Sequence, residues 1–148
     1  MMKWIDKRNP KYFAYDSYGG NCMNFASQIL YAGGIHKTKG WNWYDDWVYA
    51  HSWIAVKSFA EYASGASKKE LYCKCNDNYY RGNVGDIVLI GVESPRNHAT
   101  VISDLILNDR GETVDYLLCC NTTNLKNFPA AAYHYTNQQL FRIYGWND

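Results

Sequence analysis

Apolar positions recur at helical spacing in the first part of the chain. Residues 21–31 place their apolar side chains on one helical face, with Asn21 suited to the N-cap and Gly33-Gly34 suited to the C-terminal end. A second helix is predicted over residues 53–63, with Ser52 as its N-cap. A loop rich in aromatic residues, 41–47, separates the two helices.

The pattern then changes to short apolar runs bounded by turn residues, which is typical of strands. Helices followed by sequential antiparallel strands predict an α+β fold. We find no internal repeat or linker, so the 148 residues are expected to form one domain over 1–148. The predicted strands cover 87–90, 98–102, 113–120 and 140–144, with a short strand near 71–75 in a polar loop over 64–83 and turns at Pro95–Asn97 and Asn108–Gly111.

Composition and charge exclude several classes of protein. Hydrophobic residues make up 47% of the chain and the formal net charge is +1, which argues against a disordered segment. Acidic and basic residues are interleaved without a basic stripe, so no nucleic-acid partner is expected. The chain contains neither an apolar signal-peptide core nor a stretch long enough for a membrane span. We therefore expect either a cytoplasmic protein or an excised domain of a longer secreted or cell-surface protein, of unknown oligomeric state.

The five cysteines do not form a recognisable metal motif. Cys73 and Cys75, like the adjacent Cys119 and Cys120, are closer together than the usual ligand pairs of structural zinc sites. We expect no metal and no cofactor. An odd count leaves at least one thiol free in a monomer, and a disulfide between the two regions remains open.

Cys22 lies at the predicted start of the first helix, after Gly19-Gly20-Asn21. A cysteine in the first helical turn faces the positive end of the helix dipole and unpaired backbone N–H groups, which favour the nucleophilic thiolate. The alternative is a small buried residue without a catalytic role. Cys22 is therefore a candidate nucleophile, provided that a base reaches it.

Of the four histidines, His98 is the candidate base, because it follows a turn and begins an apolar strand. His36, His51 and His134 lie in polar or loop-like surroundings. Asn121 ends the neighbouring predicted strand, and its side-chain carbonyl would orient the imidazole. The alternatives are a surface histidine at a strand end and a turn asparagine. The order of the three candidate catalytic residues is Cys, His, Asn.

The sequence around Cys22 resembles the signature of the putative amidase domain family of bacterial proteins. That signature is close to D-C-T-N-F-V-S-Q followed by A-G-G, and here it reads N-C-M-N-F-A-S-Q over 21–28 and A-G-G over 32–34. Further similarities lie at the N-P-x-Y segment 9–12, Ser52-Trp53, the G-D-hydrophobic segment 85–88, and His98. The family is similar to the NlpC/P60 and CHAP cell-wall hydrolases, which have a papain-like fold.

The resemblance implies a papain-like fold and cysteine-dependent hydrolysis of an amide or peptide bond, in bacterial peptidoglycan or a related peptide substrate. The oxyanion would meet the backbone N–H of Cys22. Related hydrolases use an upstream side chain as the second donor, for which we favour Tyr15 over Tyr12 and Tyr18. The chain departs from the signature at Asn21, at Met23, and at Asn121, where the family usually has histidine; Asn124 is a second candidate for that third position.

The aromatic residues predict a substrate groove lined by Trp43, Trp47 and Trp53, although the same residues also suit a lid packed on the core. Two other functions remain open. One is a catalytically silent module that binds a cell-wall peptide. The other is a papain-like toxin or effector that acts on a protein substrate.

Overall fold

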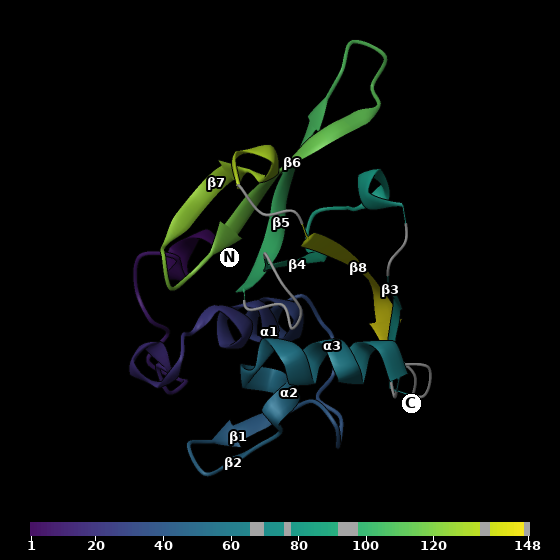
Figure 1. The fold of residues 1–148 in the computed structure, drawn as a ribbon. Helices are drawn as coiled ribbons and strands as arrows, with labels where there is room; N and C mark the ends of the chain where they lie inside the picture. The colour runs from purple at the N-terminus through teal and green to yellow at the C-terminus, as the bar shows by residue number, and fades with distance from the viewer. Residues whose placement is uncertain (66–69, 76–77, 92–97, 134–136, 147–148) are drawn as a thin grey trace.

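The computed structural model describes residues 1–65, 70–75, 78–91, 98–133 and 137–146. Within these residues the chain forms a six-stranded antiparallel sheet of order β3-β8-β4-β5-β6-β7, a two-stranded hairpin, and helices gathered on one side (Figure 1). The helices are α1 (Cys22–Ala32), α2 (His51–Ile54) and α3 (Val56–Gly65). The strands are β1 (Trp43–Asp45), β2 (Val48–Tyr49), β3 (Leu71–Cys75), β4 (Ile87–Gly91), β5 (His98–Leu107), β6 (Thr113–Cys120), β7 (Leu125–Pro129) and β8 (Asn137–Trp146).

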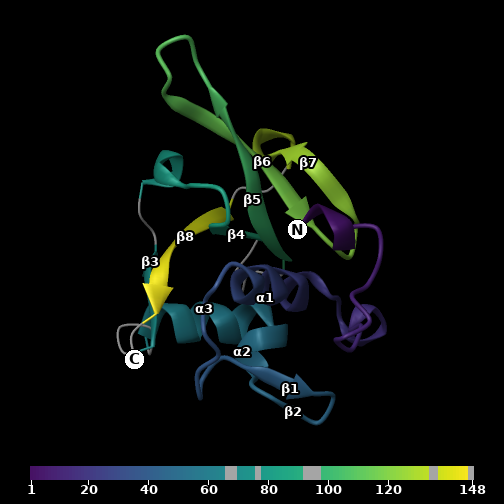
Figure 2. The ribbon, with the colours of Figure 1, turned by 180° about the vertical axis from the view of Figure 1, so that it is seen from behind.

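The sheet is buried on both faces at its centre, because alternate side chains of a strand point to opposite faces. In β4, Ile87 and Leu89 join the core beneath α1 and α3, whereas Val88 and Ile90 join a second cluster with β6 and the 3-10 turn Ala130–Ala132. Figure 2 shows the same layers from behind, with the β5–β6 hairpin projecting away from the helices. The α+β prediction is confirmed.

The helix over 21–31 is confirmed as α1, but the prediction for 53–63 is wrong in one respect. That segment divides into α2 and α3, because Ala55 between them adopts an extended conformation (φ −118°, ψ 127°). Ser52 lies inside α2, where its hydroxyl donates to the carbonyl of Gly40, so it does not cap a helix. The Ser52 hydroxyl makes a hydrogen bond to a residue distant in the sequence, so it does not accept one from a helix N-terminus.

Two elements were not expected from the sequence. The aromatic loop contains the β1–β2 hairpin, whose turn is held by Asp45 accepting hydrogen bonds from the backbone N–H groups of Trp47 and Val48. The polar segment after β6 forms the edge strand β7. The turn predicted at 95–97 and the residue His134 lie outside the described residues.

Candidate active site

Cys22 is the first residue of α1, and the loop before it is shaped to bring it there. Gly19 and Gly20 have φ values of 100° and 113°, a left-handed conformation that residues with a Cβ atom rarely adopt. The backbone N–H of Gly20 donates to the carbonyl of Tyr15 at 3.1 Å. This turn reverses the chain immediately before the helix.

The buried side chain of Asn21 fixes that loop to the helix. Its carbonyl oxygen accepts from the backbone N–H of Tyr15 at 3.1 Å and from the amide of Asn24 at 2.8 Å. Its own amide donates to the carbonyl oxygen of Asn121 at 2.7 Å. Asn21 is therefore the N-cap residue by position, but its side chain makes tertiary contacts instead of capping α1.

The turn that follows β6 is hydrogen-bonded to the loop before α1. The hydroxyl of Thr122 accepts from the backbone N–H of Asn21 at 2.7 Å and donates to Asp16 at 3.1 Å. Arg8 forms an ion pair with Asp16 and also donates to Asn124 at 3.1 Å. The residue that precedes Cys22 is thus held against the sheet from both its backbone and its side chain.

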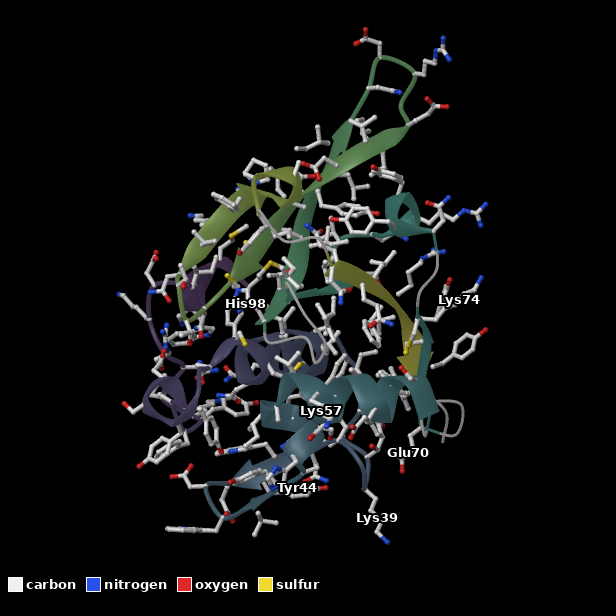
Figure 3. All side chains as sticks on the ribbon, in the orientation of Figure 1. Lys39, Tyr44, Lys57, Glu70, Lys74 and His98 are labelled. Atoms are coloured by element: carbon white, nitrogen blue, oxygen red, sulfur yellow. The ribbon has the colours of Figure 1, made fainter. Side chains whose placement is uncertain are left out.

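Cys22 and His98 line one pocket of about 310 Å³, together with the glycine turn, Thr122, Thr123, Leu125 and Tyr133. His98 begins β5, at the end of the strand that lies over α1 (Figure 3). The backbone N–H of Ala99, the next residue, interacts with the Cys22 sulfur. The structure therefore brings together two side chains that are far apart in the sequence.

Burial disfavours the charged forms of Cys22 and His98. Burial raises the pKa of the Cys22 thiol, although the backbone N–H groups of Ala99, Met23 and Cys22 itself oppose the rise. Burial also lowers the pKa of His98 below its usual 6.5. The favourable effect of the helix terminus on the thiolate is outweighed by the loss of water around the sulfur. Both shifts favour the uncharged forms, a thiol at Cys22 and a neutral imidazole at His98.

Asn121 has hydrogen-bond partners other than the imidazole. Its carbonyl oxygen accepts from Asn21, and its amide donates to the carbonyl of Trp4 at 2.9 Å. Within the described residues no hydrogen bond joins His98 to Asn121 or to Cys22. In this structure Asn121 supports the segment that carries Cys22, and Asn124 is engaged by Arg8.

The three tryptophans of the predicted groove lie in different environments. Trp53 is fully buried and donates to Asn24 at 3.0 Å, and Trp43 also lies in the core. Trp47 is 92% exposed on the β1–β2 turn, beside a second cavity that Tyr15 also lines. Of the three, Trp47 is the exposed one, and a substrate groove at these residues stays a prediction.

The sequence predicted no metal site and no membrane span, and these can be compared with the described residues. All five cysteines are free, with the Cys73 and Cys75 sulfurs 3.6 Å apart. The described part of the chain contains no group of three or more metal-ligating side chains. No helix in that part is long and apolar enough to cross a membrane.

Sequence reasoning selected Asn121 and Asn124 but missed the two threonines between them. Thr122 and Thr123 line the pocket in left-handed conformations, with φ values of 68° and 52°. Tyr133 is the other omission, and its ring centre lies 6.3 Å from that of His98. The polar run Asn121–Asn124 at a strand end was the available signal for the threonines, whereas nothing local marked Tyr133.

The family model described as a putative amidase domain matches residues 1–144. A Bacillus subtilis protein, "Uncharacterized protein YhbB", is 32% identical over 118 residues, which are 74% of this chain and 35% of that protein. The chain thus spans about a third of that relative's length. No solved structure matches the chain significantly.

Proposed function

Because this chain belongs to the putative amidase domain family, we propose that it is a cysteine-dependent amidase or peptidase with Cys22 as nucleophile and His98 as base. The family points to amide hydrolysis. The observation that carries the finer proposal is that a helix-terminal thiol and a half-buried imidazole, whose pKa is lowered, line one pocket. We further propose that residues 1–148 act as a single papain-like domain.

In the first step, a neutral His98 takes the proton of the Cys22 thiol as the sulfur attacks the carbonyl carbon of the substrate amide. The C=O bond opens to an oxyanion. When the tetrahedral intermediate collapses, the C–N bond breaks and the His98 imidazolium gives its proton to the leaving amine. The products of this step are a free amine and a thioester on Cys22.

In the second step, water replaces the amine. His98 removes a proton from water, the resulting oxygen attacks the thioester carbonyl, and the C–S bond breaks. The proton returns from the imidazolium to the sulfur, so the net reaction consumes one water and gives a carboxylic acid and an amine. No metal or redox group enters this scheme.

Backbone N–H groups at the start of α1 are the proposed oxyanion donors. The first N–H groups of a helix have no intrahelical acceptor, and those of Cys22 and Met23 already point towards the sulfur. Two such donors near a carbonyl undergoing attack would stabilise the developing charge. Tyr15 remains the proposed side-chain donor, although it lines the neighbouring cavity.

We propose a peptide of bacterial peptidoglycan as the substrate. This choice follows from the resemblance of the sequence motif to the cell-wall hydrolases, and the bacterial source of the relative agrees with it. A binding module without catalysis would need neither the thiol nor the imidazole in its pocket. A toxin or effector would use the same chemistry on a protein.

The test is digestion of purified peptidoglycan, with the released peptides identified by mass and new amines counted. The wild type and Cys75→Ala, a cysteine of β3, should release the same products at similar rates. Cys22→Ala and His98→Ala should release almost none, while keeping the wild-type circular dichroism spectrum. Binding of peptidoglycan without any release would instead support the silent module, and turnover of a protein substrate alone would support the effector.

A further inference from the structure

A second cavity, of about 390 Å³, is lined mainly by the segment before α1 and the β1–β2 hairpin, and it shares no lining residue with the pocket of Cys22. We call it the aromatic cavity. Five rings and one carboxylate line it, and no basic side chain does. These residues are Phe13, Tyr15, Tyr18, Asp46, Trp47 and Tyr49.

Three of the rings contact one another edge to face. Phe13 and Tyr15 meet edge to face at 5.0 Å between ring centres, and Tyr15 and Tyr49 do so at 5.9 Å. Trp47 stands at the rim, 92% exposed. Edge-to-face contacts leave the electron-rich faces of some rings free for a ligand, and such faces attract cations.

The negative charge in the cavity also favours a cation. Asp46 is the charged side chain among the lining residues. Burial is the main cause that raises the pKa of Tyr15, and the negative charge of Asp46 adds a smaller contribution, behind those of Trp43 and Tyr49. The carboxylate thus lies within electrostatic reach of the Tyr15 hydroxyl. A cation gains from both the ring faces and the carboxylate, whereas an anion would be repelled and a neutral sugar would gain from neither charge term.

The Tyr15 hydroxyl is buried and lies beside two polar groups of the protein. Tyr15 is 7% exposed, and the indole N–H of Trp43 and the hydroxyl of Tyr49 lie near its oxygen, although neither contact has good hydrogen-bond geometry within the described residues. Tyr15 therefore contributes its ring to the cavity, and the attraction for a cation comes from the ring faces and from Asp46.

We propose that the aromatic cavity binds a primary ammonium group carried by the substrate peptide, such as a lysine-type side chain. The inference rests on the proposed function, because the cavity would then position the scissile amide. The link between the two sites is short. Tyr15 donates its backbone N–H to the side chain of Asn21, the residue before Cys22, and accepts from Gly20 of the pocket wall.

The experiment measures binding to the Cys22→Ala protein, so that no turnover interferes. Tryptophan fluorescence and calorimetry would compare a lysine-containing tripeptide, the same peptide acetylated on its side-chain amine, and an N-acetylglucosamine oligosaccharide. We expect the acetylated peptide to bind about tenfold more weakly than the free amine, because it loses both the charge and the cation–π contact. Asp46→Asn and Trp47→Ala should each weaken binding of the free amine several-fold.

Matched controls separate a local effect from a general one. Tyr44→Ala removes another exposed ring of the same hairpin outside the cavity lining, and Asp109→Asn removes a carboxylate from the distant β5–β6 turn. Both should leave binding unchanged. Equal affinity for the free and acetylated peptides, or binding of the oligosaccharide alone, would overturn the proposal. Hydrolysis by the wild type without amine selectivity would refute this inference only, whereas selective amine binding without hydrolysis would refute only the proposed reaction.

Discussion

Replacing Asn121 by alanine tests how the segment before Cys22 is held. The side chain is 1% exposed, and its removal leaves the Asn21 amide and the Trp4 carbonyl without their partners. An unsatisfied buried polar group costs about 1–3 kcal/mol, and water can reach the half-buried Trp4. We therefore expect Asn121→Ala to lower the free energy of unfolding by about 2–3 kcal/mol.

The same substitution separates two roles for Asn121. If it acts through Asn21, then Asn21→Ala and Asn121→Ala should both lower kcat/KM for amide hydrolysis, and the double variant should lose less than the sum of the two effects. The acidic midpoint of the pH–rate profile, which reports His98, should not move in either variant. Urea unfolding followed by tryptophan fluorescence gives the stabilities, and we expect a coupling free energy of about 1 kcal/mol.

The reasoning would be refuted by additive effects of the two substitutions on stability. It would also be refuted if Asn121→Ala moved the acidic midpoint while Asn21→Ala did not. The second result would assign Asn121 to His98 after all, in the role that the sequence predicted. Thr123→Ala, at a pocket residue whose side chain has no hydrogen bond within the described residues, is a control that should leave the midpoint in place.

Further predictions concern the base, the strained turn and the core. Burial lowers the pKa of His98, so kcat/KM should be lost on acidification through a midpoint below 6.5; a midpoint above 6.5 would mean that a negative group stabilises the imidazolium. Thr123 has a φ of 52°, so Thr123→Gly should stabilise the protein by about 0.5 kcal/mol in urea unfolding, and a loss of stability would argue against strain there. Trp53→Phe should cost about 2–3 kcal/mol in the same assay, because it removes buried volume and leaves the Asn24 carbonyl unpaired; a change below 0.5 kcal/mol would contradict the hydrogen bond.

The spacing of apolar residues predicted the helices and strands in which that spacing is regular. The helix after Asn21 and the strand over 87–90 follow from apolar spacing alone. The break at Ala55, where the backbone is extended, did not follow, because the apolar spacing that predicted the helix continues across it. β7 was missed because an edge strand needs few apolar residues, and its own sequence is Leu-Lys-Asn-Phe-Pro.

The sequence predicted which residue types form the candidate site, but not the hydrogen bonds that hold them in place. Residue type and position were enough to select Cys22 and His98, and the structure brings them to one pocket. The partners of Asn121 lie 100 and 117 positions away along the chain, so no local pattern could have revealed them. The direction of the Cys22 pKa also depends on burial, which the helix-terminus argument did not include.

The central claim is that an acyl group passes through the sulfur of Cys22. The most direct measurement is acid quenching during turnover of soluble peptidoglycan peptides, followed by peptide mapping by mass spectrometry. We predict an acyl adduct on Cys22 that hydroxylamine removes, and no amide hydrolysis by Cys22→Ala. Hydrolysis that proceeds with every cysteine free of an acyl group, and that persists in Cys22→Ala, would contradict the claim.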